Sequence, residues 1–322
     1  MKKSRLLVLL CVMSTFLFVP ALARADWRPT AVIRVLVPYN AGGQSDLYAR
    51  KIGAIIQQQK LLPVNWLVVN MTGGSTQEAL NTLYNAKPDG TTLLVHHSAL
   101  LTQSALGQTK YKPEDFTSIA EFMENVSTLS VRGNAKWKNF EEFLAEGKAN
   151  PGKLRIAMPG VGNVNHFMAL DVLSRLNAAN LFRFVPCNGG AEAASRLMGD
   201  QVEARFALSA DAARFVRAGD ERLLLILGVD PVKVFPDVPT AAKFGLKSSV
   251  VNRIGVQGPK GMPADMVKTL SAVIRKVTET KEFREFTEQQ ASETVYRDGK
   301  DWAPMQQTDL KAMQQIVSQI KK

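Results

Sequence analysis

The sequence has few of the residues from which catalytic and metal centres are built. Its 322 residues include two cysteines and three histidines, so a Cys/His metal cluster or a catalytic triad has few possible members. The motifs G-x-S-x-G, H-E-x-x-H, C-x-x-C and G-x-x-x-x-G-K-[S/T], typical of hydrolases, metal or redox sites and nucleotide-binding loops, are absent. After residue 25 no apolar run approaches the about 20 residues of a membrane-spanning helix. These absences argue against an enzyme of a common class and against a membrane-spanning mature chain.

The N-terminal segment has the parts of a secretory signal peptide. A basic start with Lys2, Lys3 and Arg5 precedes the apolar stretch 6–19. Two small-x-small patterns typical of signal-peptide cleavage sites follow it within residues 21–25. We therefore expect a cleaved signal peptide of residues 1–25, or one ending two residues earlier, and a mature chain in the periplasm. An uncleaved membrane anchor is the alternative, which the short apolar stretch disfavours.

Cleavage changes the charge and the cysteine content. Residues 1–25 carry four basic residues and no acidic one, so the formal net charge falls from +11 to +7. Cleavage also removes Cys11 and leaves Cys187, so no disulfide forms within the mature chain. The basic residues are spread along the chain without an aromatic-rich cluster, which argues against nucleic-acid binding. With 46% hydrophobic residues the chain can build a conventional core, and its length favours two domains.

Short apolar runs alternate with amphipathic stretches, which is the pattern of an α/β fold. Strands are expected at 33–37, 64–69, 91–96, 129–131, 154–158, 182–185, 202–208, 223–228 and 254–257. Helices are expected at 47–59, 77–86, 140–149, 167–176, 191–198, 209–218, 264–280, 282–290 and 301–320. No short-period repeat or low-complexity tract interrupts this order.

Three of the predicted strands lead through a proline and closely spaced glycines into a helix. These strand–turn–helix joints are 33–46, 154–163 and 184–191. In the first joint, Gly42 and Gly43 permit a sharp turn, and Ser45 or Asp46 is expected to cap the helix. The N–H groups and the dipole at a helix start favour an anion such as a carboxylate. Because ligands of open parallel sheets bind at the carboxyl ends of the strands, the three joints predict a ligand site.

The order of short motifs along the mature chain resembles one known family. The motifs are Val37 to Asp46, Lys87 to Leu94, Asn150 to Leu154, Gly160 to His166, Val185-Pro186 with Gly189, Gly199 to Glu203, Phe235 to Thr240 and Gly258 to Pro263. In this order they resemble the substrate-binding proteins of tripartite tricarboxylate transporters, also called the Bug family.

The resemblance implies a two-domain periplasmic binding protein fold of type II, which closes on its ligand like a flytrap. Each domain would be a mainly parallel sheet flanked by helices. Domain one would comprise residues 26–127 and 250–322, and domain two residues 128–249. The implied ligand is a small carboxylate: a di- or tricarboxylate, an acidic amino acid or an aromatic acid. The implied partners are the membrane subunits of such a transporter, and we expect a monomer without metal or cofactor.

The resemblance also implies which residues bind the ligand. On domain one they are Tyr39, Gly43, Gln44, Ser45, Asp46 and Ser98, and on domain two Gly162, Asn163, Asn165, His166, Asn188 and Gly189. The chain departs from the family pattern at several of these loops. Gln44 replaces a third glycine, the loop 70–77 is shorter and lacks a proline, and Ala207 replaces a frequent aspartate. The resemblance therefore does not imply which acid this protein binds.

Each of these residues also has a structural interpretation. Asp46 could act only as a helix cap and His166 as a cap or surface residue, and Cys187 is read as a small buried residue. The pair His96-His97 is rejected as a metal site because neighbouring strand residues point to opposite faces. Two alternative functions stay open: a ligand sensor for a membrane signalling kinase, and a secreted hydrolase that uses Ser45 or Ser98 with His166.

Overall fold

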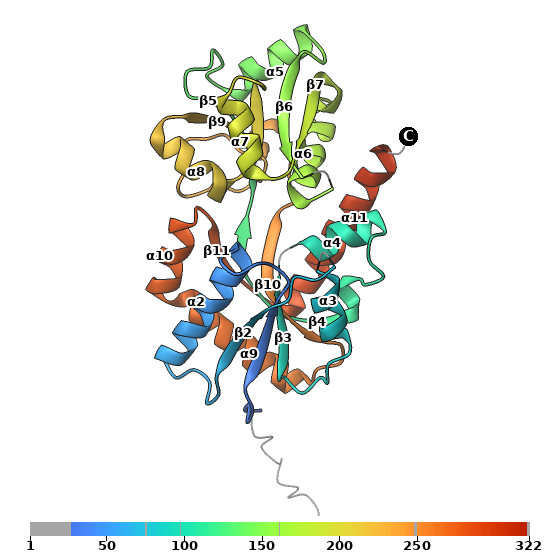
Figure 1. Cartoon of the computed structure of the whole chain (residues 1–322), viewed down its shortest axis with the longest axis vertical. Helices are drawn as coiled ribbons and strands as arrows, with labels where there is room; N and C mark the ends of the chain where they lie inside the picture. Colours follow the sequence, from blue (N-terminus) through green and yellow to red (C-terminus); the bar gives the residue numbers. More distant parts are fainter. Residues whose placement is uncertain (1–26, 75, 97, 161, 248–249, 321–322) are drawn as a thin grey trace, which may run out of the picture.

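The chain forms two α/β lobes, one above the other (Figure 1). The computed structural model describes residues 27–74, 76–96, 98–160, 162–247 and 250–320. The predicted signal peptide and His97 lie outside the described residues. Within these ranges no helix is both long and apolar enough to cross a bilayer.

Lobe one is a six-stranded sheet flanked by helices. Its strand order is β11-β4-β10-β3-β1-β2. The strands are β1 (Ile33–Val37), β2 (Trp66–Asn70), β3 (Thr92–His96), β4 (Phe116–Asn125), β10 (Asn252–Pro259) and β11 (Glu293–Asp298). The helices are α2 (Gln44–Gln58), α3 (Gln77–Tyr84), α4 (Ala99–Leu106), α9 (Ala264–Glu279), α10 (Lys281–Gln289) and α11 (Gly299–Ile320), with the 3-10 turn η1 (Pro113–Asp115).

Lobe two is a five-stranded sheet in the order β7-β6-β8-β5-β9. Its strands are β5 (Ser127–Arg132), β6 (Leu154–Pro159), β7 (Phe182–Cys187), β8 (Ala204–Leu208) and β9 (Glu221–Ile226). Its helices are α5 (Phe140–Ala149), α6 (Val164–Arg175), α7 (Gly190–Met198) and α8 (Ser209–Ala218), with the 3-10 turns η2 (Ala179–Leu181) and η3 (Ala241–Phe244). The chain passes from lobe one to lobe two at Val126 and returns before β10.

Both sheets are mixed, which corrects the expectation of mainly parallel sheets. In lobe one β1 pairs in parallel with β2 and β3, whereas β10 and β11 run antiparallel to their neighbours. In lobe two β6 is parallel to β7 and β8, whereas β5 is antiparallel to β8 and β9. The double passage of the chain accounts for β5 and β10, which start at the boundary between the lobes. Strand β11 also starts there, because it is antiparallel to β4, and the remaining strands end there.

Two strands and one α-helix were absent from the sequence expectation. They are strands β4 and β11 and helix α4. Strand β4 contains Glu121, which is completely buried, and a buried carboxylate breaks the apolar pattern by which strands are recognised. Strand β11 contains charged residues and is only half buried, and α4 has little amphipathic character.

The hydrophobic core of lobe two extends into lobe one along one side. Leu310, Met313, Ile316 and Val317 of α11 belong to the same buried cluster as the residues of α6, and so does Leu101 of α4. Figure 1 shows α11 rising from the lower lobe beside α6 of the upper lobe. Helices α4 and α11 therefore join the lobes on this flank.

Candidate ligand-binding site

The topology brings the three strand–turn–helix joints to the boundary between the lobes. Strand β10 starts at this boundary and is antiparallel to β3, so β3 ends there, and so do β1 and β2, which run parallel to it. Strand β5 starts at the same boundary, so β8, β6 and β7 end there too. The loops after β1 and β3 thus face the loops after β6 and β7. This arrangement is the one expected for a site between two lobes.

The buried carboxylate of Asp46 organises the first loop. Asp46 is 1% exposed. Its oxygens accept hydrogen bonds from the Gly42 N–H at 2.9 Å, from Arg50 Nε at 3.0 Å and from Asn70 Nδ2 at 2.9 Å. Asn70 also donates to the backbone oxygen of Tyr39 at 3.0 Å. Asp46 therefore ties the loop to its own helix and to the end of β2.

The surroundings of Asp46 keep it ionised. Burial alone would raise its pKa, but the hydrogen bonds from Arg50, Gly42 and Asn70 outweigh burial and hold the pKa below the usual value. Arg50 and Asn70 were not among the residues predicted from the sequence. The spacing of Asp46 and Arg50, four residues apart on one helix, was the available signal, whereas nothing local indicated Asn70.

Helix α2 starts without a side-chain cap. Its N-cap residue is Gly43, and no side chain accepts a hydrogen bond there, so the expected capping by Ser45 or Asp46 is wrong. The reason is that α2 begins at Gln44, which places both residues inside its first turn. Ser45 is 1% exposed, and its Oγ has no hydrogen-bond partner among the described residues. The start of α2 thus keeps backbone and hydroxyl groups available for an anion.

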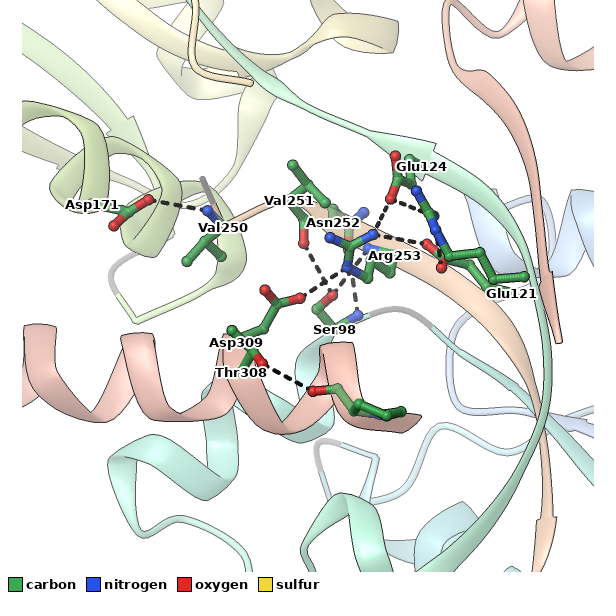
Figure 2. A network of polar contacts seen from close by, with 12 residues as sticks. Ser98, Glu121, Glu124, Asp171, Val250, Val251, Asn252, Arg253, Thr308 and Asp309 are labelled. Atoms are coloured by element: carbon green, nitrogen blue, oxygen red, sulfur yellow. Dashed lines mark hydrogen bonds and ion pairs between the residues drawn. The ribbon is translucent and has the colours of Figure 1, made fainter. Parts of the chain in front are cut away.

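Ser98 lies beside the returning chain. Its Oγ accepts a hydrogen bond from the Arg253 N–H at 3.0 Å and donates to the Val251 oxygen at 3.4 Å. Its own N–H donates to Asn252 Oδ1 at 3.3 Å. Figure 2 shows Ser98 within this network at the start of β10. The hydroxyl of Ser98 is thus engaged in anchoring the crossing segment.

On lobe two, Asn163 caps helix α6. Its side chain accepts a hydrogen bond from the His166 N–H at 3.2 Å and donates to the Pro159 oxygen at 2.6 Å. The chain turns before this cap at Gly160 and Gly162, with φ of +76° and +81°, a region in which glycine carries no steric penalty. Asn163 thereby fixes the wall from which Asn165 and His166 project.

The second bond of this loop determines which nitrogen of His166 carries the proton. The Gly162 N–H donates to His166 Nδ1 at 3.0 Å, so Nδ1 is an acceptor and the neutral ring carries its proton on Nε2. Burial lowers the pKa of His166, which favours the neutral ring at pH 7. The half-buried ring thus has an Nε2–H group to donate to a ligand.

Asn165 carries a second polar atom without a partner. The side chain is 7% exposed, and its Oδ1 has no hydrogen-bond partner among the described residues. Buried polar atoms are nearly always hydrogen-bonded. The Ser45 hydroxyl on lobe one can donate to a carboxylate, whereas Asn165 Oδ1 on lobe two is an acceptor and can bond only a donor group such as a ligand hydroxyl.

The loop after β7 adds the third joint. Gly189 is the N-cap of α7 with φ of +115°, and the Asn188 N–H donates to Glu192 Oε2 at 2.7 Å. The Asn188 side chain is exposed.

The two walls approach each other at the end of α4, since a Cβ added to Gly162 would lie 3.0 Å from Leu106 Cδ1.

The remaining candidates have structural roles. His96 is buried and its Nε2 lies 2.6 Å from Gln257 Oε1. Within the described ranges no group of three or more His, Cys, Asp or Glu residues is arranged to hold a metal ion. Cys187 is buried, as expected, and burial raises the pKa of its thiol.

Comparison with known proteins identifies the family. The model of the tripartite tricarboxylate transporter family receptor matches residues 50–321. The curated protein BugT of Bordetella pertussis is 26% identical over 286 residues, which are 87% of this chain and 86% of BugT. Two solved structures of similar size extend the comparison.

A TctC solute-binding protein from Polaromonas superposes with a TM-score of 0.81 at 28% identity, covering 90% of this chain and 99% of that one. MatC of Rhodopseudomonas palustris with bound malate superposes with a TM-score of 0.70 at 26% identity, covering 90% of this chain and 99% of MatC. The expected family and fold are confirmed. This chain belongs to the tripartite tricarboxylate transporter receptor family, whose members are periplasmic solute-binding receptors.

Proposed function

We propose that this protein captures a small carboxylate between its two lobes in the periplasm and delivers it to the membrane subunits of a tripartite tricarboxylate transporter. One observation carries the proposal: the uncapped start of α2, with the unpartnered Ser45 hydroxyl, lies at the same boundary between the lobes as the start of α6, where neutral His166 has Nε2–H as a donor. The two groups come from different lobes. A ligand that touches both therefore stabilises the closed arrangement.

The chemistry of the two walls suits a carboxylate. The N–H groups and dipole of α2 favour negative charge, and His166 Nε2 is a donor in the neutral ring. Donors of this kind bind a carboxylate without an arginine. The likeness to MatC, whose structure contains malate, supports a di- or tricarboxylate, and acidic amino acids and aromatic acids belong to the same proposed class.

We place the domain boundaries at the two crossings of the chain, with residues 26–127 and 250–322 in domain one and 128–249 in domain two. The protein would act as a monomer after removal of residues 1–25. Rotation of the domains about the crossing segments would open and close the site.

The two alternative functions differ in what supports them. A secreted hydrolase would need His166 as the base for a serine, but its Nδ1 already accepts the Gly162 N–H and the Ser98 hydroxyl is engaged by Arg253 and Val251. The geometry therefore disfavours catalysis. A sensor for a membrane kinase would use the same fold and ligand, so genes for transporter subunits beside this gene would favour uptake.

The experiment is thermal unfolding of residues 26–322, refolded to remove any co-purified ligand, against carboxylates, neutral amides and sugars. A ligand at 100 times its Kd adds about 2.7 kcal/mol to the free energy of unfolding. A rise in the midpoint with one group of acids, and none with the matched amides, is expected. A rise with sugars alone would contradict the proposal.

A further inference from the structure

The two walls of the predicted site differ in the hydrogen-bonding groups that they leave unused. On lobe one these groups can donate: they are the N–H groups at the uncapped start of α2 and the Ser45 hydroxyl. The acidic residue of this wall, Asp46, is already bonded to Gly42, Arg50 and Asn70. A ligand carboxylate therefore finds its partners on lobe one.

On lobe two the unused groups include two acceptors. Asn165, in the first turn of α6, is 7% exposed, and its Oδ1 has no hydrogen-bond partner among the described residues. Asp211, in the first turn of α8, forms no hydrogen bond or ion pair within the described part of the chain. Both helices follow strands that end at the boundary between the lobes, β6 and β8. An acceptor bonds only a donor, so a ligand would need N–H or O–H groups at these positions.

Asp211 lies beside the third strand–turn–helix joint. A Cβ added to Gly190, the first residue of α7, would stand 3.1 Å from Asp211 Oδ2. Gly190 directly follows Asn188 and Gly189, which are predicted site residues. Asp211 was not predicted from the sequence, because an acidic residue in the first turn of a helix is common for the helix dipole alone. Its position extends the wall of lobe two from α7 to α8.

The two arginines whose charges act on Asp211 have other partners. Arg205 pairs with Glu221, with 2.9 Å between Nε and Oε1, and the Arg214 guanidinium carbon lies 4.5 Å from the centre of the Phe215 ring. Both positive charges lower the pKa of Asp211, but desolvation by the surrounding protein has the larger effect and raises it. Water still reaches the Asp211 side chain. A positive group of a ligand at this position would offset the desolvation.

The wall of lobe two has no basic side chain that could balance Asp211. The loops after β6, β7 and β8 contain no lysine or arginine in residues 159–166, 187–192 and 208–211. Their other carboxylate, that of Glu192, accepts the Asn188 N–H at 2.7 Å and pairs with Arg196 at 2.7 Å. Asp211 is thus an unpaired negative charge, which repels a second carboxylate and attracts an ammonium group.

From these unused groups we propose that the ligand is an amino acid, with its carboxylate at the start of α2 on lobe one and its ammonium group at Asp211 on lobe two, and with Asn165 Oδ1 as a second acceptor. This inference rests on the proposed function and narrows it. An acid without a donor group would bond the donors of lobe one but leave the acceptors of lobe two unbonded. The ammonium group should therefore increase the affinity about 10- to 100-fold.

The test compares pairs of acids that differ in one ammonium group. The pairs are L-aspartate and succinate, L-glutamate and glutarate, and L-phenylalanine and 3-phenylpropanoate. Calorimetry of residues 26–322, refolded to remove any co-purified ligand, gives the Kd of each compound. In the pair that binds, the Kd of the amino acid should be about 10- to 100-fold lower than that of the matched acid.

Two variants and one matched control assign this preference to residues. Asp211→Asn removes the charge at nearly constant size and should reduce the ratio of the two Kd values about tenfold, because the matched acid has no ammonium group to lose. Asn165→Ala removes the second acceptor and should also reduce the ratio. The control is Asp301→Asn, because Asp301 is likewise an exposed aspartate in the first turn of a helix, but α11 starts at the end of lobe one away from the boundary.

The ratio separates recognition from stability, since damage to the fold would change both Kd values of a pair alike. If no acid and no amino acid binds, the proposed function fails and this inference with it. If acids bind and the amino acids have no advantage, the inference is overturned while the proposed function stands. An advantage that Asp211→Asn leaves unchanged overturns the role of Asp211. Tighter binding of L-malate than of L-aspartate and succinate would overturn the ammonium group in favour of a hydroxyl.

Discussion

Replacement of Asp46 by alanine should destabilise the protein as well as weaken ligand binding. The change removes the acceptor of the Gly42 N–H, Asn70 and Arg50 and leaves these donors without their partner. A hydrogen bond to a charged group contributes about 1.5–3 kcal/mol. The Arg50 side chain is 51% exposed, so solvent screens its share. We therefore expect a loss of about 2–4 kcal/mol rather than the sum of three full bonds.

This loss corresponds to a fall in the thermal midpoint of about 4–8 °C for a chain of this size. Because the folded pKa of Asp46 lies below its usual value, the contribution is present at neutral pH and is lost as the pH falls through the folded pKa. The difference between wild type and variant should shrink in acid. Asp237→Asn is the control, since no hydrogen bond or ion pair of Asp237 is found with the described residues. An unchanged midpoint for Asp46→Ala at pH 7 would show that these hydrogen bonds do not stabilise the fold.

Three further predictions concern single residues. His166→Ala should raise the Kd of the bound acid about 10- to 100-fold in calorimetry, because it removes one donor to a charged group, with little change in the thermal midpoint; an unchanged Kd would place His166 outside the site. Arg205→Ala should lower the free energy of unfolding by about 3–5 kcal/mol in urea titrations, because it leaves the fully buried Glu221 carboxylate without its partner at 2.9 Å; the exposed Arg183→Ala should not. Burial raises the pKa of Glu121 to about 7, so the free energy of unfolding should fall as the pH rises from the usual glutamate range to about 7. Glu121→Gln should make this fall smaller. The same dependence of the free energy of unfolding on pH in wild type and variant would contradict the prediction.

The elements with complete local signals could be predicted from the sequence. Helices α5 and α8 have the expected bounds, 140–149 and 209–218. Asn139 caps α5 by accepting the Glu142 N–H at 2.8 Å, and Gly219 ends α8 with φ of +79°. Each cap involves residues close together in sequence, so the local sequence is enough to predict where these helices begin and end.

The missed strand β4 shows why other elements could not be predicted. Its Glu121 is buried because Arg253 and Arg297 reach it from strands that are 132 and 176 residues away in sequence. The partners of a buried charge are set by the fold, and local patterns do not contain them.

At the candidate site, the sequence predicted which loops meet but not the contacts that they make. The loops after β1, β3, β6 and β7 do end at one boundary, as the strand order requires. The contacts of Asp46 with Asn70, and of Gly162 with His166 Nδ1, depend on exact loop conformations. These contacts determine which polar side chains are hydrogen-bonded within the protein and which can bond a ligand.

A crystal structure of the protein with the acid that gives the largest thermal shift would show where the ligand binds. We predict the acid between the two lobes, with one carboxylate at the start of α2 and a hydrogen bond from His166 Nε2. Density for the acid on one lobe only would contradict the proposed function.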